Sequence, residues 1–525
     1  MHCRLSILLA VASTLLGTAT ANKARPRHCK GEAKHIHLAV GHDPAHEMTI
    51  SFATKYSNSE GDNAPLGGIH IGLEPDKLDR FVPEQEYPLH YKEKNPDGKR
   101  YNSPYQHHIT IDELEADTTY YYAIVVGQRD DGIEALKKRP IKHFYSTATE
   151  ENVLNAKKTV DGGDQRRRRL LPPHYDGSEL PCIEGQQVRS FRTAPKRGEG
   201  PVSFAVIGDL GQFSFSEETL QHLSDNKEGI HATILAGDIS YNEFDHRRWD
   251  TFFDFLDDYE IFHEIPLHIA TGNHDIEKRE DGNVIFEAYE TRFRMPQVQP
   301  EQREVFDFPG LLNMDAPSYP LPYDWGNAYY SFDYGLAKHI VLSAYSSMEP
   351  DSPQYKWVKK ELKSVDRSIT PWVLVTIHTP LYNTFDKHHY DPQIIAAKDN
   401  IEPLLVKYHV NFVLTGHIHA YLRTSKVAMG ERNDKGPVHI TIGAGGRQCS
   451  AGFQNEEPED WVEARDASFF GYGRIDIRNS THAEWRWIPL SASVKHPRNT
   501  VYGQKEMVLP SLMFDEFVLE NQYFL

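Results

Sequence analysis

Short apolar segments alternate with helical segments from residue 204 to residue 414, and this alternation restricts the folds open to the chain. Apolar segments predict strands at Phe204–Ile207, Thr233–Ala236, Leu267–Ala270, Ile340–Ala344, Trp372–Ile377 and Phe412–Leu414. Between the second and third strands, Trp249, Phe252, Phe253 and Leu256 share one helical face, and Ser352-Pro353 is typical of a helix N-terminus. Strands separated by helices predict an α/β sandwich with parallel strand pairs.

Polar side chains follow five of these strands directly. The strand exits read Gly208-Asp209-Leu210-Gly211, Gly237-Asp238-Ile239-Ser240-Tyr241, Gly272-Asn273-His274-Asp275, His378-Thr379-Pro380 and Gly416-His417-Ile418-His419. Ligands of α/β sheets bind at the carboxyl ends of strands, so these side chains should meet. A single Asp after a strand is usually a helix cap, and a single His is usually structural. Carboxylate, amide, phenol and imidazole together are the composition of a metal site rather than of a nucleophilic triad.

The five segments, in this order, resemble the purple acid phosphatases, a branch of the calcineurin-like metallophosphoesterases. The resemblance extends from about Ala39 to Ile488 and includes Ala467–Arg474 near its end. Tyr241 is the discriminating residue, because the wider superfamily usually lacks a phenol there. The resemblance implies an N-terminal all-β, fibronectin type III-like sandwich, followed by an α/β metallophosphoesterase sandwich of mixed sheets flanked by helices.

The resemblance also implies two adjacent metal ions with seven ligands. Asp209, Asp238, Tyr241 and His419 would hold Fe³⁺, whereas Asp238, Asn273, His378 and His417 would hold Zn²⁺, Fe²⁺ or Mn²⁺. Asp238 would bridge the two ions. The chemistry agrees, since a hard trivalent ion favours carboxylate and phenolate oxygen, and a borderline divalent ion accepts imidazole and amide.

The function implied by the resemblance is acid hydrolysis of phosphate monoesters, by attack of a metal-bound hydroxide at the Fe(III)–M(II) site. His274 matches a family histidine that contacts phosphate and can protonate the leaving oxygen. His388 and His389 lie in the region of a second family pair, although an exposed loop pair is an equal alternative for them. Two other functions stay open: a phosphodiesterase or nucleotide hydrolase using the same site, and a non-catalytic binding protein.

The region before the linker at Ala194–Gly200 has a different pattern, in which short β-branched or aromatic segments are separated by turn residues. They predict strands at His35–Val40, Met48–Ala53, Gly68–Gly72, His107–Ile111, Tyr120–Val126 and Ser190–Thr193. Leu114–Tyr120 resembles the tyrosine corner of fibronectin type III sandwiches, in which the Tyr hydroxyl binds backbone. A polar stretch near residues 128–187 reads as an insertion, and its Arg166–Arg169 run is either solvated or a protease site.

These patterns define the expected domain organisation. We expect a signal peptide at residues 1–21, a β domain at 29–195, a catalytic core at 201–435, its C-terminal part at 436–500 and a tail at 501–525. The signal rests on Arg4, the apolar run to Leu16 and the small residues Ala19-Thr20-Ala21. That run is shorter than the about 20 residues of a membrane span.

The net charge and the predicted targeting signals limit the partners and compartments open to the chain. The formal net charge of −18 argues against nucleic acid or an anionic membrane, while a metal pair can still attract a phosphate ester locally. The signal and the sequon at Asn479 predict a secreted glycoprotein, in the extracellular space or an acidic vacuole-like compartment. Cys29 and Cys182 are the weakly favoured disulfide pair, which leaves Cys449 as a thiol. A homodimer is an expectation by analogy with two-domain relatives alone.

Overall fold

The computed structural model describes residues 33–55, 64–127, 132–138, 187–277, 285–297, 318–449, 451–492 and 514–522. The predicted signal peptide, Cys29, Cys182, the Arg166–Arg169 run and most of the predicted insertion lie outside these residues. By their contacts, the described residues belong to one compact unit. Among them, no helix has both the length and the apolar character needed to cross a membrane.

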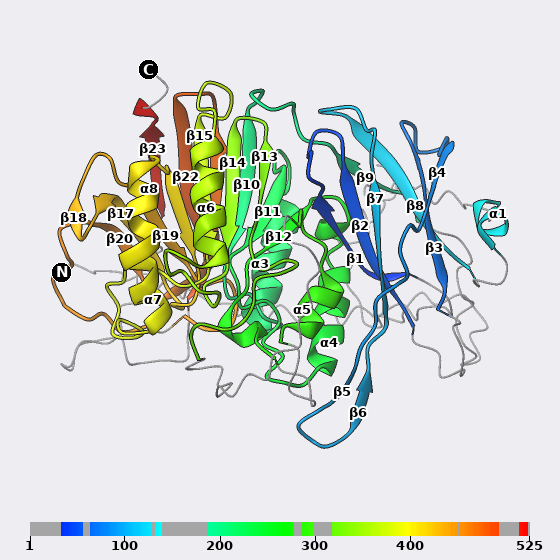
Figure 1. Cartoon of the computed structure of the whole chain (residues 1–525), viewed down its shortest axis with the longest axis horizontal. Helices are drawn as coiled ribbons and strands as arrows, with labels where there is room; N and C mark the ends of the chain where they lie inside the picture. The colour runs from blue at the N-terminus through cyan, green and yellow to red at the C-terminus, as the bar shows by residue number, and fades with distance from the viewer. Residues whose placement is uncertain are drawn as a thin grey trace, which may run out of the picture. The chain divides into compact units, whose positions relative to one another are not determined.

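The N-terminal part consists of antiparallel sheets, with one short helix, α1 (Gly132–Lys137), after β8. One sheet has the order β1 (Lys34–Val40), β2 (Met48–Thr54), β7 (Tyr105–Ile111). The second has the order β4 (Arg80–Pro83), β3 (Leu66–Gly72), β8 (Thr119–Gly127), β9 (Arg189–Arg192). Strands β5 (Lys92–Lys94) and β6 (Arg100–Asn102) form a separate hairpin (Figure 1).

All six strands predicted for this part are present, with ends shifted by up to two residues. Alternate residues such as Ile50, Ile69, Ile109 and Ile124 are buried in the core. The Tyr120 hydroxyl accepts a 2.8 Å hydrogen bond from the backbone N–H of Glu115, which is the bond that a tyrosine corner makes. The N-terminal part is therefore all-β, and its fibronectin type III-like character stays a prediction.

The larger part contains two mixed sheets. The six-stranded sheet has the order β12 (Leu267–Ile269), β11 (Ala232–Leu235), β10 (Val202–Ile207), β21 (Phe469–Ile477), β22 (His482–Ala492), β23 (Asp515–Glu520). The eight-stranded sheet has the order β13 (Tyr330–Tyr334), β14 (Ala337–Leu342), β15 (Trp372–Ile377), β16 (Phe412–Thr415), β19 (Val438–Ile442), β17 (Tyr421–Ala428), β18 (Glu431–Arg432), and β20 (Val462–Asp466) also pairs with β17. Strands β10–β12 are parallel to one another, as are β14, β15, β16 and β19.

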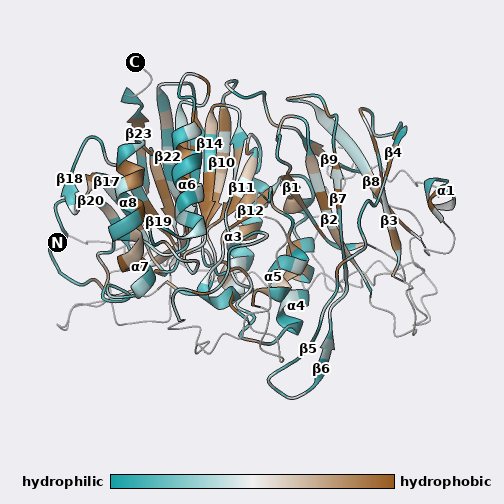
Figure 2. Cartoon of the chain, viewed as in Figure 1, coloured by the Kyte–Doolittle hydropathy of each residue, from teal (hydrophilic) through white to brown (hydrophobic). Residues whose placement is uncertain are grey.

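Helices accompany the parallel strands as predicted. They are α3 (Ser214–Asp225), α4 (Arg247–Asp257), α5 (Glu287–Arg292), α6 (Pro353–Ser364), α7 (Pro392–Ala396) and α8 (Glu402–Lys407), with short turns at η2 (Ile261–His263), η3 (Asn273–Asp275) and η4 (Ala397–Ile401). Helix α4 buries the four predicted residues from Trp249 to Leu256. At α6, the Ser352 hydroxyl accepts the backbone N–H of Tyr355 at 3.2 Å, which confirms the predicted N-cap. The strands of both sheets are mostly hydrophobic, whereas α6 is largely hydrophilic (Figure 2).

The C-terminal segment contributes strands to both sheets. Strand β19 joins the eight-stranded sheet, while β21 pairs with β10 and β22 extends the other sheet. Part of the expected tail forms β23, antiparallel to β22. The tryptophans of β22 pack on glycines of β21: a Cβ added at Gly473 would lie 1.9 Å from the Trp485 ring.

Candidate metal centre

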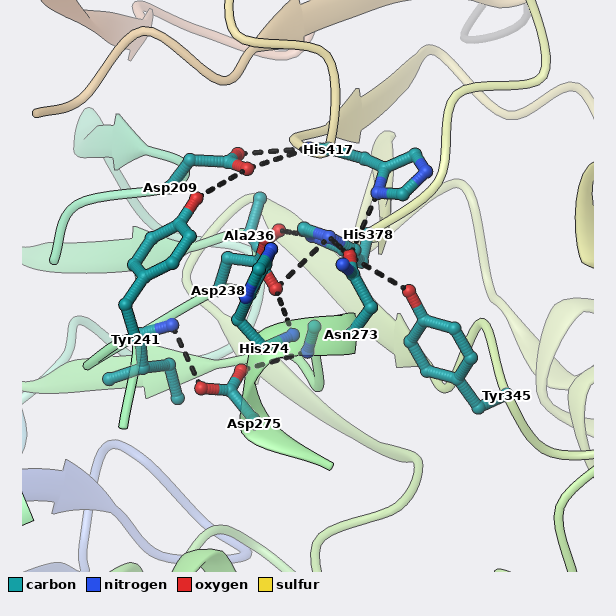
Figure 3. A network of polar contacts seen from close by, with 12 residues as sticks. Asp209, Ala236, Asp238, Tyr241, Asn273, His274, Asp275, Tyr345, His378 and His417 are labelled. Atoms are coloured by element: carbon teal, nitrogen blue, oxygen red, sulfur yellow. Dashed lines mark hydrogen bonds and ion pairs between the residues drawn. The ribbon is translucent and has the colours of Figure 1, made fainter. Parts of the chain in front are cut away.

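Asp209 and Asp238 lie side by side because the strands before them are parallel neighbours. Ile207 of β10 pairs with Leu235 of β11, and the backbone turns immediately after each of these strands. Asp209 and Asp238 have left-handed φ angles of 55° and 52°. The Asp209 N–H donates to the Gly237 carbonyl at 3.1 Å, so the first loop is tied to the second. The Asp209 carboxylate in turn accepts the backbone N–H of His417, at 2.9 Å from Oδ2 (Figure 3).

The first group of donor atoms surrounds the Asp209 carboxylate. The Tyr241 hydroxyl lies 3.2 Å from Asp209 Oδ1 and 3.0 Å from His419 Nε2. His419 Nε2 lies 3.3 Å from the same Asp209 oxygen. Asp209, Asp238 and His419 each offer a donor atom within 4.8 Å of the others. The four residues predicted to hold Fe³⁺ therefore converge.

The second group surrounds the Asn273 side chain, which points between two imidazoles (Figure 3). Asn273 Oδ1 lies 3.0 Å from His378 Nε2 and 2.9 Å from His417 Nδ1. His378 Nε2 also lies 3.4 Å from Asp238 Oδ1. His378 Nδ1 lies 2.7 Å from the Ala236 carbonyl, which can only accept, so Nδ1 carries a proton and Nε2 is the nitrogen directed at the second donor group. The two groups share Asp238.

Glycines before the donor residues allow the loops to approach this closely. A Cβ at Gly416 would lie 2.4 Å from Asp209 Oδ2. A Cβ at Gly237 would lie 2.4 Å from His378 Nδ1, and its φ of 87° is in the left-handed region. The small residues at the strand exits are thus required by close packing.

The pKa shifts of the buried donor side chains are those expected of groups that bind metal cations. Burial raises the pKa of the Tyr241 phenol well above its usual value, and the Asp209 and Asp238 carboxylates add to this rise. Burial also raises the pKa of the Asp209 carboxyl. Burial acts the same way on Asp238, but the charges of His378 and His274 outweigh it and lower the pKa. Two carboxyls and a phenol, crowded together and fully buried, become stable anions when positive charge lies between them.

His274 and His388 both lie at the centre. The backbone N–H of His274 donates to Asp238 Oδ1 at 2.8 Å. The His274 imidazole has Nδ1 3.0 Å from Glu243 Oε1, and its ring centroid is 4.5 Å from that of Tyr241. The His388 ring centroid is 4.2 Å from that of His417. His389 instead directs Nε2 at the carbonyl of Phe385 in its own loop.

Sequence reasoning gave no role to several side chains that support this centre. Buried Asp275 accepts the N–H groups of Ile239 at 3.0 Å and Gly272 at 2.9 Å, and burial, followed by the charge of Asp238, raises its pKa to about 7. The Tyr345 hydroxyl donates to Asn273 Oδ1 at 3.3 Å. Tyr345 lies just beyond the apolar segment 340–344, so it could have been included with the other strand exits.

Asp391 is a second such residue. Its Oδ2 lies 2.9 Å from His388 Nδ1 and 3.3 Å from His417 Nε2, so one carboxylate joins the two histidines. Together with them it offers three donor atoms within 4.8 Å. Nothing in its local sequence marked it, because Asp391-Pro392 reads as an ordinary helix start.

The fold and the two donor groups define a calcineurin-like phosphoesterase, and residues 202–421 match the calcineurin-like phosphoesterase family model. Residues 33–144 match the purple acid phosphatase N-terminal domain, and residues 436–494 match the iron/zinc purple acid phosphatase-like protein C model. The chain belongs to the purple acid phosphatase family. Purple acid phosphatase 22 of Arabidopsis thaliana is 31% identical over 462 residues, covering 87% of this chain and 82% of the relative.

Other relatives agree over different lengths. Purple acid phosphatase 1 of Ipomoea batatas is 30% identical and covers 86% of this chain and 80% of the relative. Probable purple acid phosphatase 20 of Arabidopsis thaliana is 35% identical, but this chain spans only 64% of its length. Among solved structures, purple acid phosphatase PPD1 from yellow lupin has a TM-score of 0.64 at 18% identity, over 93% of this chain and 74% of that one, a likeness of fold.

Proposed function

We propose that this chain is a metal-dependent phosphatase that hydrolyses phosphate monoesters. The observation that carries the proposal is the convergence of seven donor side chains from five strand exits into two groups that share Asp238. A dinuclear site of mixed oxygen and nitrogen donors is suited to phosphoryl transfer, because it can neutralise charge on both the attacking and leaving oxygens.

We assign the two donor groups to different metals. Asp209, Asp238, Tyr241 and His419 provide mainly oxygen donors, which suit Fe³⁺. Asp238, Asn273, His378 and His417 add two imidazoles, which suit a divalent ion such as Zn²⁺. A relative named Fe(3+)-Zn(2+) purple acid phosphatase 12, from Arabidopsis thaliana, is 28% identical over 403 residues, which supports this pair.

The metal pair, when bound, supplies the Lewis acidity that polarises the phosphoryl group and makes a water molecule acidic enough to attack phosphorus. The chain's own contribution is to hold the donors and to place a proton. His274 stands beside them with a side chain 15% exposed, and Glu243 at 3.0 Å from Nδ1 fixes the ring. This leaves His274 Nε2 to donate a proton to the leaving oxygen. His388, aligned by Asp391, is the second candidate for this role.

The test is the rate of p-nitrophenyl phosphate hydrolysis from about pH 4 to pH 8. We expect the highest rate on the acid side, and a loss of about a thousandfold in Asp238→Asn, because both metals lose a shared ligand. Asp112→Asn, an exposed pair partner of Arg80, is the control for a lost carboxylate and should keep full activity. Absence of hydrolysis by a folded chain with both metals bound would overturn the proposal. Faster hydrolysis of bis(p-nitrophenyl) phosphate than of p-nitrophenyl phosphate would indicate a phosphodiesterase instead.

We also infer secretion and glycosylation, which rest on the predicted signal and on Asn479. Asn479 is exposed between β21 and β22, where its Oδ1 accepts the Thr481 N–H at 2.9 Å. Expression in a secreting eukaryotic host should give a product whose mass falls on deglycosylation. An unchanged mass would refute the glycan at this position.

A further inference from the structure

Two arginines stand beside the tyrosine of the metal centre and share one aromatic neighbour. The guanidinium carbon of Arg447 lies 4.7 Å from the ring centroid of Phe213 and 5.3 Å from that of Tyr241. The guanidinium carbon of Arg248 lies 6.0 Å from the Phe213 centroid. The Phe213 and Tyr241 rings meet edge to face at 5.9 Å. We call Arg447 and Arg248 the arginine pair.

The loops of the metal centre hold this pair in place. The backbone N–H of Arg447 donates to the Asp209 carbonyl at 3.1 Å. The preceding Gly446 is packed so closely that an added Cβ would lie 2.3 Å from Ser216 Oγ. Arg248 is fixed from the other side: its carbonyl accepts Gln212 Nε2 at 2.9 Å, and the same amide donates to the Ser240 carbonyl at 3.1 Å. Both arginines are therefore anchored to the loops that carry Asp209 and Tyr241.

The side chains of the pair are half-buried and keep their hydrogen-bond donors available. Within the described part of the chain, neither guanidinium takes part in a hydrogen bond or an ion pair. Arg292, by contrast, is engaged in an ion pair, 2.9 Å from Asp250. Glu243, an acid whose pKa the charges of Arg447 and Arg248 help to lower, is itself directed at His274, and that contact is the main cause of the lowering.

We propose that Arg447 and Arg248 bind a second phosphate of the substrate, next to the phosphoryl group held at the metal centre. The inference rests on the proposed function and narrows its substrate class to diphosphates and vicinal bisphosphates. A guanidinium fork matches phosphate oxygens with two parallel hydrogen bonds, and stacking on Phe213 orients the fork. An apolar leaving group at this place would leave those donors unsatisfied. The chain as a whole carries a net charge of −18, so attracting an anionic substrate requires local positive charge such as that of the arginine pair.

The experiment compares adenosine diphosphate with adenosine monophosphate, using kcat/KM of the metal-loaded enzyme. We expect Arg447→Gln and Arg248→Gln each to lower kcat/KM for the diphosphate by about tenfold, chiefly through KM, because each removes charge-assisted hydrogen bonds. The value for the monophosphate should stay within about twofold. Arg447→Lys should restore part of the loss. Arg432→Gln, which removes an equal charge from the exposed pair with Glu463, is the control and should leave kcat/KM unchanged for both substrates.

A binding measurement separates this inference from the proposed function. Methylenediphosphonate, whose P–C–P bridge resists hydrolysis, should bind the metal-loaded wild type about tenfold more tightly than inorganic phosphate in calorimetry. Arg447→Gln should remove that difference. Equal losses for diphosphate and monophosphate, or equal affinity of the wild type for both ligands, would overturn the inference. A wild type that binds the diphosphonate tightly but hydrolyses no ester would contradict only the proposed function.

Discussion

At the scale of single residues, His417 uses its two nitrogens for different purposes. Nδ1 lies 2.9 Å from Asn273 Oδ1 in the donor group, and Nε2 lies 3.3 Å from Asp391 Oδ2. A carboxylate behind a ligating imidazole fixes its tautomer and makes it a better ligand. With His417 assigned to the divalent ion as proposed above, Asp391 would act as its positioning residue.

Asp391→Asn should weaken binding of the divalent metal by about 10- to 100-fold and leave the iron in place. A chelator titration followed by metal analysis measures this. Asp386→Asn, in the same loop but exposed, is the matched control and should behave as the wild type. Equal metal retention in Asp391→Asn and the wild type would show that Asp391 has no positioning role.

Buried histidines make the folded chain sensitive to acid, and His439 is the simplest case. It is 3% exposed, lies 4.6 Å from the Tyr382 ring, and burial, followed by the charge of Lys398, lowers its pKa to about 3. In the unfolded chain His439 therefore becomes protonated below about pH 6.5, whereas in the folded chain it stays neutral down to about pH 3. This contribution to stability is complete above pH 6.5 and falls as the pH drops toward 3.

His439→Phe removes that titration and keeps an aromatic ring of similar size. The difference in unfolding free energy between variant and wild type should grow in favour of the variant by on the order of 3 kcal/mol between pH 7 and pH 4. Urea titrations at several pH values measure it. His482→Gln, at a position whose side chain is 45% exposed, is the control for the loss of a histidine. A pH-independent difference for His439→Phe would refute the account.

At the scale of loops and strands, Gly237 tests whether close packing at the strand exits is necessary. Gly237→Ala places a Cβ 2.4 Å from His378 Nδ1 in addition to the cost of its φ of 87°. Gly430 has a nearly equal φ of 86° and nothing within 4 Å of an added Cβ. Gly430→Ala should therefore cost about 1 kcal/mol of stability, from backbone conformation alone.

Gly237→Ala should cost several times more than Gly430→Ala in thermal or urea unfolding, and should also lose metal, because His378 must move. Similar costs for the two variants would mean that His378 relaxes freely, contrary to the packing argument.

Sequence patterns predicted the elements that position the site, and missed others for identifiable reasons. Strands β10, β11, β12, β15 and β16 are short apolar runs followed by donors, so both strand and donor were visible. In strand β21, Arg474 and Asp476 alternate with buried Ile475 and Ile477, which is typical of a half-buried strand, but this stretch contributes only to the family resemblance and no strand is predicted there. Arg447 and Asp391 come from segments without a motif, and they reach the centre through tertiary contacts that no local pattern encodes.

At the scale of the whole molecule, an ion pair of the larger part, between buried Arg292 and half-buried Asp250, holds the Tyr101 hydroxyl of the N-terminal part. Arg292 is fully buried, lies 2.9 Å from Asp250 of α4, and donates to the Tyr101 hydroxyl of β6 at 2.6 Å. Its ring neighbours are Tyr91 and Phe253, at 5.9 Å each. Removing the carboxylate would leave a buried cation without its counter-charge.

Asp250→Asn should therefore lower the free energy of unfolding by about 3 kcal/mol or more. Asp112→Asn, which breaks an exposed pair with Arg80 in the N-terminal part, should cost about 1 kcal/mol or less. Urea unfolding monitored by tryptophan fluorescence compares them. Equal effects of the two substitutions would contradict a linking role for Arg292.

The central claim, that five strand exits build one dinuclear centre, is tested most directly by counting metals in the purified chain. Elemental analysis should find two metal ions per folded chain, one of them iron, and Asp238→Asn should lose most of both because its carboxylate belongs to both donor groups. A visible absorption band that disappears in Tyr241→Phe would place the iron beside the phenol. One metal ion or none in a folded wild type supplied with excess iron and zinc, or full retention of both metals in Asp238→Asn, would contradict the account.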